Sequence, residues 1–93
     1  MSNESLIERV LSACRSYDAG EIGLEHLVSS VELNLGALEG LVESRRRQLQ
    51  HLATSLEFAQ FEYEDEDRIS KATALVTQLK DSLQSILRVG SDA

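Results

Sequence analysis

The fold of this chain is decided by residues 69–86, which read ISKATALVTQLKDSLQSI. Apolar residues recur there at steps of three, four, three, four and three. They are Ile69, Ala72, Val76, Leu79, Leu83 and Ile86. This spacing draws one apolar stripe along an α-helix and matches the a and d positions of a heptad repeat. A helix over about residues 67–89 is therefore predicted.

The same periodicity predicts three earlier helices, over about residues 4–17, 24–34 and 38–61. Their stripes are Ile7, Val10, Cys14 and Tyr17, then Leu24, Leu27, Val28, Val31, Leu35 and Leu38, then Leu38, Leu41, Val42, Arg45, Leu49, Leu52, Leu56, Ala59 and Tyr63. Gly20 can end the first helix in the left-handed conformation. Asn34 and Gly36 favour a break or sharp bend between the second and third helices, with a continuous helix as the alternative.

Composition points to an all-α fold. The chain has 93 residues, no Pro, no Trp, 42% hydrophobic residues and only 4% aromatic residues. A core built from Leu, Val, Ile and Ala is typical of helix-on-helix packing. We expect residues 1–93 to form a single domain, an antiparallel bundle of three to four helices with a long C-terminal helical hairpin.

The net charge and a few individual residues argue against several kinds of function. The net charge is −7, which opposes nucleic acid and anionic membranes as direct partners. The lone Cys14 is expected to be a small core residue in a protein of the reducing cytoplasm. The opening MSNESLIERV is acidic where a secretory leader would be basic. His26 and His51 have no metal-site spacing, so neither a metal nor a cofactor is expected.

Ten of the sixteen acidic residues lie in two segments, residues 21–44 and 62–67. In the first segment, Glu25, Glu32 and Glu39 are heptad-spaced, so a continuous or gently bent helix would align them in a ridge. This ridge is either a solvated outer face or a surface for a basic partner. Both interpretations remain open from the sequence.

The second acidic segment adjoins most of the aromatic residues. Residues 62–67 read EYEDED, and their carboxylates are Glu62, Glu64, Asp65, Glu66 and Asp67. Helix capping accounts for one or two of these acids, not for five. Phe58 and Phe61 lie off the apolar stripe, so at least one ring should be poorly buried by its own helix. With Tyr63 they either anchor a basic protein or cover the fourth or first helix.

Two stretches carry a family resemblance, LIERVLSACRSYDAGEIGLEHL at residues 6–27 and LEFAQFEYEDEDR at residues 56–68. In these, and in its length and acidity, the chain resembles the small acidic helical immunity proteins that bacteria make against their own bacteriocin or contact-dependent nuclease toxins. The resemblance covers about half the chain and contains no diagnostic motif. It implies a helical inhibitor whose partner is a toxin or nuclease domain.

Two functions follow as hypotheses, and neither is an enzyme, since no nucleophile motif or phosphate loop can be assembled. The first is an immunity or antitoxin-like inhibitor, a monomer or weak homodimer, that covers a basic active-site cleft. Its contacts would be the EYEDED carboxylates with Phe58, Phe61 and Tyr63. The second is an assembly module that pairs with itself or a companion subunit through the apolar heptads.

Overall fold

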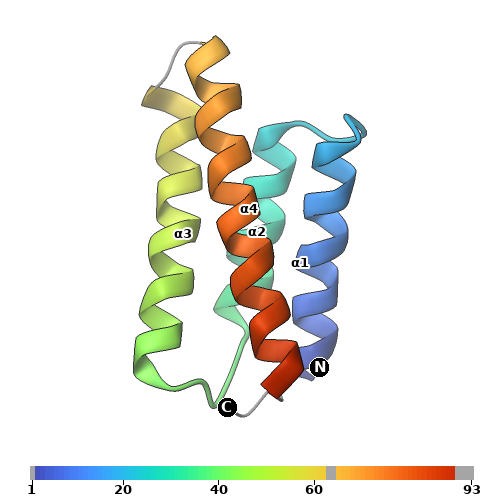
Figure 1. Ribbon diagram of the computed structural model, residues 1–93, viewed down its shortest axis with the longest axis vertical. Helices are drawn as coiled ribbons and strands as arrows, with labels where there is room; N and C mark the ends of the chain where they lie inside the picture. Colours follow the sequence, from blue (N-terminus) through green and yellow to red (C-terminus); the bar gives the residue numbers. More distant parts are fainter. Residues whose placement is uncertain (1, 63–64, 90–93) are drawn as a thin grey trace.

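The protein is a four-helix bundle in which the chain runs alternately up and down (Figure 1). The structure, a computed structural model, describes residues 2–62 and 65–89. Within them lie α1 (Asn3–Asp18), α2 (Leu24–Gly36), α3 (Glu43–Glu62) and α4 (Asp65–Val89). Each helix packs on the next along the chain, and α4 closes the bundle against α1. The all-α prediction is confirmed, and none of these helices is long and apolar enough to cross a membrane.

The core is built from the apolar stripes of all four helices. Its buried members are Ile7, Val10, Leu11, Cys14, Leu27, Val28, Val31, Leu49, Leu52, Leu56, Ala59, Ala72, Leu75, Val76, Leu79, Leu83 and Ile86. Cys14 is among them as predicted, and burial raises the pKa of its thiol to about 11. A thiol with such a pKa stays protonated and unreactive near neutral pH.

The turn after α1 forms as the sequence predicts. Gly20 has φ +78°, the left-handed region that glycine adopts without steric cost. Its N–H donates to the carbonyl of Tyr17 at 3.0 Å, and the N–H of Glu21 donates to the carbonyl of Ser16 at 2.9 Å. This pair of bonds is a Schellman motif, which satisfies carbonyls that the end of α1 would otherwise leave free.

The break between α2 and α3 exists, but it lies after Asn34. The helix runs through Asn34 because the buried side chain donates from Nδ2 to the carbonyl of Ser30 at 2.8 Å. That bond holds the amide against its own helix instead of in a turn. The helix then ends at Gly36, with Ala37 as its C-cap.

The predicted start of the third helix at residue 38 is wrong, because α3 begins at Glu43. Gly40 has φ +74°, which a right-handed helix cannot include. Leu38 and Leu41 still pack partly buried against the core, so they keep the apolar stripe without helical backbone. Val42 is half exposed, and its carbonyl accepts from the first turn of α3.

The connection between α2 and α3 is tied to the start of α1. Ser2 caps α1 by accepting from the N–H of Ser5 at 3.1 Å. Asn3 reaches across to Glu39: its Nδ2 donates to the Glu39 carbonyl at 2.5 Å, and its Oδ1 accepts from the Glu39 N–H at 3.0 Å. One side-chain amide therefore satisfies both backbone groups of a loop residue.

Replacing Asn3 with alanine should lower the free energy of unfolding by about 1 kcal/mol, because two exposed hydrogen bonds are lost together. Urea denaturation measures the change. The control is Ser12→Ala, which truncates an exposed polar side chain of the same helix and should not lower the stability. Equal stability of all three would show that the bridge contributes nothing.

Candidate binding surface

One end of the molecule is formed by α3 and α4 alone, because the last turns of α3 and the first turns of α4 extend beyond α1 and α2 (Figure 1). Three large apolar side chains in the last five residues of α3 and the first five residues of α4 are exposed. Phe58 is 54% exposed, Phe61 74% and Ile69 62%. Exposed apolar side chains that cluster mark contact surfaces more often than isolated ones do. We call Phe58, Phe61 and Ile69 the apolar tip.

The two phenylalanines are exposed because of their phase on α3. Leu56 and Ala59 turn into the core, and positions 58 and 61 then fall on the other side of the helix. Being three residues apart, the two rings are neighbours on the helix surface. The prediction that at least one ring is poorly buried is confirmed. The alternative, that the three rings cover the fourth or first helix, does not hold for Phe58 and Phe61, and Tyr63 lies outside the described residues.

Ile69 departs from its predicted place in the heptad seam of α4. The seam residues that follow, from Ala72 to Ile86, are buried, whereas Ile69 is exposed. It is the fifth residue of α4, close to the start of the helix at Asp65. The heptad spacing continues to this residue, but the prediction that its side chain belongs to the buried seam is wrong.

Acidic residues surround the apolar tip in the sequence. Glu66 and Asp67 are exposed in the first turn of α4, where negative charge is favoured by the helix dipole. Glu57 is exposed on α3, directly before Phe58. Tyr63 and Glu64 lie outside the described residues, and so do the side chains of Glu62 and Asp65.

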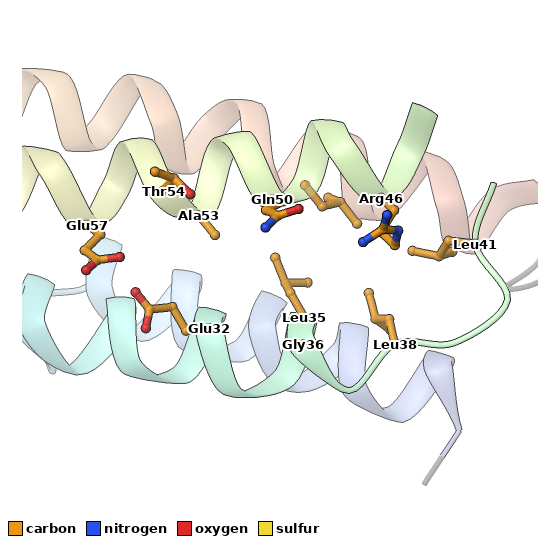
Figure 2. Close-up of a pocket in the computed structure, with 11 residues that line it drawn as sticks. Glu32, Leu35, Gly36, Leu38, Leu41, Arg46, Gln50, Ala53, Thr54 and Glu57 are labelled. Atoms are coloured by element: carbon orange, nitrogen blue, oxygen red, sulfur yellow. The ribbon is translucent and has the colours of Figure 1, made fainter. Parts of the chain in front are cut away.

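A groove of about 310 Å³ lies between α2 and α3 (Figure 2). Its residues are Glu32, Leu35, Gly36, Leu38, Leu41, Arg46, Leu49, Gln50, Ala53, Thr54 and Glu57. Two of them explain why the helices leave space there. Gly36 has no side chain and nothing lies within 4 Å of where its Cβ would be, and Ala53 on the facing helix contributes only a methyl group.

Two carboxyl groups face each other at one end of this groove. Glu32 on α2 and Glu57 on α3 point toward one another in Figure 2. A side-chain hydrogen bond with Glu57 raises the pKa of Glu32, with smaller contributions from burial and from the charge of Glu57. In that bond a protonated Glu32 donates to the Glu57 carboxylate. Above the raised pKa both groups are charged and repel.

The other end of the groove holds a cation that is already paired. Arg46 Nη2 lies 2.7 Å from Glu43 Oε1, and its Nε lies 3.2 Å from Oε2. Arg47 Nε also donates to Glu43 Oε1, at 3.2 Å. The hydrogen bond from Arg46 is the main cause that lowers the pKa of Glu43. Arg46 is thus held by its own helix, and the unbalanced charge of the groove is negative.

The predicted ridge of Glu25, Glu32 and Glu39 does not form. Glu25 and Glu32 are both exposed on α2, but Glu39 lies beyond the end of that helix, and its backbone is bonded to Asn3. Glu57 and the groove were not predicted from the sequence. No local pattern indicates them, because Glu32 and Glu57 belong to different helices and meet only through packing.

No protein-family model, curated protein or solved structure matches the chain. The function must therefore be argued from its own residues. Both histidines are exposed, and within residues 2–62 and 65–89 no group of three or more His, Cys, Asp or Glu side chains could hold a metal ion.

Replacing Glu32 with glutamine should raise the stability at pH 7, because the amide can donate to Glu57 without a second charge. Both side chains are exposed, so screening should keep the gain below about 0.5 kcal/mol. The pKa of Glu32 is raised in the folded protein. The shared proton therefore stabilises the wild type below the ordinary glutamate pKa, and this contribution is lost as pH rises through the raised pKa.

The stability difference should consequently appear at pH 7 and vanish near pH 4, which urea denaturation at the two pH values measures. Glu8→Gln is the matched control, since it removes the same charge from an exposed position of α1 that lies beyond the first turn of that helix. A gain that is equal for both variants would reflect only the lower net charge and would contradict a specific Glu32–Glu57 interaction.

Proposed function

We propose that this chain is a protein-binding inhibitor of the immunity or antitoxin type, which masks the basic active-site cleft of a toxin or nuclease domain. The observation that carries the proposal is the exposure of Phe58 and Phe61, which lie three residues apart near the C-terminal end of α3. In the sequence, Phe61 is followed directly by the EYEDED segment, residues 62–67.

The aromatic rings and the carboxylates of this surface contribute to the proposed contact in different ways. Large aromatic side chains that lose water on binding supply much of the affinity of protein interfaces. Carboxylates around them attract a basic surface over distance and speed the encounter. In this proposal they stand in for the phosphates of a nuclease substrate. The resemblance to bacterial immunity proteins supports the choice of partner, and a reducing cytoplasm suits the single buried thiol.

The alternative is an assembly module that pairs through the heptad seam of α4. Ile69 favours it, because this one seam residue is exposed at 62%. Leu79, Leu83 and Ile86 are fully buried within the bundle and could not face a second chain unless the bundle opened. Light scattering separates the two functions. A stable oligomer that is insensitive to salt would favour assembly, and a monomer or weak dimer would favour inhibition.

The charge of the acidic segment should set the rate at which a partner binds. The partner is first captured from the cells that make this chain, and its association is then followed by stopped flow. Glu64→Gln, Asp65→Asn, Glu66→Gln and Asp67→Asn together should slow association about tenfold at low salt and flatten its salt dependence.

The control combines Glu4→Gln, Glu8→Gln, Glu21→Gln and Asp81→Asn, four exposed positions elsewhere on the chain. It removes the same net charge and should change the rate less. An unchanged rate in the first variant, or equal slowing in both, would exclude residues 64–67 as the contact.

A further inference from the structure

We propose that the groove between α2 and α3 seats a basic amphipathic segment of a partner protein. A lysine or arginine of that segment lies between Glu32 and Glu57, and an apolar side chain next to it packs against Leu35, Leu38 and Leu41. This inference rests on the proposed function in one respect, that the occupant is a protein, but it assigns a surface separate from the apolar tip.

The apolar part of the groove has room for an added side chain. Three leucines of the groove pack against the core but are only partly buried, namely Leu35, Leu38 and Leu41. In Figure 2 Leu38 and Leu41 lie toward the end of the groove opposite Glu32 and Glu57, and Leu35 lies between the two ends. A cavity of about 150 Å³ accepts a benzene ring, so a groove of about 310 Å³ holds roughly two side chains.

The charged end of the groove is complementary to a cation. Glu32 and Glu57 point toward one another across it, and this contact raises the pKa of Glu32. A lysine or arginine between them would allow both groups to ionise and would replace repulsion by two charge-assisted hydrogen bonds. Arg46 does not supply this cation, because Glu43 holds it at the opposite end.

The spacing of these features defines the segment that fits. Glu32 and Leu35 are three residues apart on α2, so their levels along the helix differ by about 4.5 Å. Basic and apolar residues three or four positions apart on a partner helix have a similar separation. A helix laid into a groove commonly presents side chains at these intervals. Gln50 and Thr54 add polar groups along the wall formed by α3.

The groove and the apolar tip meet on α3. Glu57 belongs to the groove, and Phe58 follows it directly in the chain. Phe61 lies four residues after Glu57, which places it one turn further on nearly the same face of the helix. One partner can therefore cover both surfaces, and variants that change only one of them separate their contributions.

The test is an NMR titration of the ¹⁵N-labelled chain with a synthetic helical peptide in which lysine and leucine alternate at three- and four-residue spacing. Amide shifts should move in residues 32–41 and 46–57. The double variant Glu32→Gln/Glu57→Gln should weaken binding about tenfold. Its control, Glu8→Gln/Glu21→Gln, removes two exposed charges elsewhere and should weaken binding less than threefold.

A second pair of variants tests the apolar contact. Ala53→Leu places a larger side chain in the groove and should weaken peptide binding at least fivefold. Ala74→Leu makes the same change at an exposed position of α4 and should leave binding unchanged. Circular dichroism of each variant shows whether the helical fold persists.

Several results would overturn the proposal. Equal weakening by the two double variants would mean that only the net charge attracts the peptide. Shifts confined to the turns around Phe58 and Phe61 would place the peptide on the apolar tip, which leaves the proposed function intact and removes the groove. Groove shifts that depend on protein concentration without peptide would identify a second copy as the occupant. Conversely, Phe58→Ala/Phe61→Ala should leave peptide binding in the groove unchanged even if the proposed function fails.

Discussion

Replacing Leu56 with alanine should destabilise the protein by about 3 kcal/mol. Leu56 is fully buried in the middle of α3 and is part of the shared core. The variant leaves a cavity in addition to losing the burial of the removed methyl groups. A chain of 93 residues has a total stability of roughly 5–14 kcal/mol, so this loss is a large part of the whole.

Thermal and urea denaturation measure the effect, and the melting temperature should fall by about 15 °C. Leu33→Ala is the control, because Leu33 is 74% exposed on α2 and the same atoms are removed. Its stability should change by less than about 0.5 kcal/mol. Similar losses in both variants would mean that α3 does not contribute its stripe to the core as described.

Replacing Phe58 and Phe61 together with alanine should weaken binding of the captured partner about 100-fold or more. Aromatic anchors at the centre of an interface often contribute 2 kcal/mol or more each, and about 2.7 kcal/mol is a factor of 100. The loss should appear mainly as faster dissociation, because the rings hold the complex and do not attract it over distance. Stability should hardly change, since both side chains are exposed.

Calorimetry gives the dissociation constant, and surface plasmon resonance divides it into rates. Leu33→Ala again serves as the control, because it removes an exposed apolar side chain from another helix and should leave binding unchanged. Full affinity in the double phenylalanine variant would end the proposal that the apolar tip is the binding site. Loss of affinity in both variants would point to a general effect of exposed apolar area.

The helices were predictable where the signal is local. The stripe from Ala72 to Ile86 on α4 and the stripe from Ile7 to Cys14 on α1 are buried as expected, because a helix repeats its facing side every three to four residues regardless of what packs on it. The turn at Gly20 is also local, since a positive φ favours glycine.

Helix ends were less predictable for a physical reason. Leu38 and Leu41 fit an apolar helical stripe but belong to a loop that also covers the core. The spacing of apolar residues predicts which side chains are buried. It does not distinguish a helix from an irregular segment that buries the same side chains. The left-handed Gly40 marks this difference in the structure, whereas a glycine in the sequence is compatible with either.

The exposure of the aromatic rings could be inferred in part. Helix phase places Phe58 and Phe61 off the stripe of Leu49, Leu52 and Leu56, but phase alone does not say whether a neighbouring helix covers them. The answer depends on how the neighbouring helices pack beside α3, and in the structure both rings are more than half exposed. Ile69 is the opposite case, because its position continues the buried stripe of α4 and yet its side chain is exposed.

The sequence by itself determined the helical class, most of the core and the concentration of acid next to aromatic residues, because these depend on composition and on spacing within one helix. Only the tertiary structure decided that Glu32 faces Glu57, that a groove separates α2 from α3, and that Ile69 has no cover. Contacts between helices depend on their relative lengths and alignment. The relative lengths and alignment of the helices follow from how their four apolar stripes pack together. They cannot be predicted from one segment of the sequence alone.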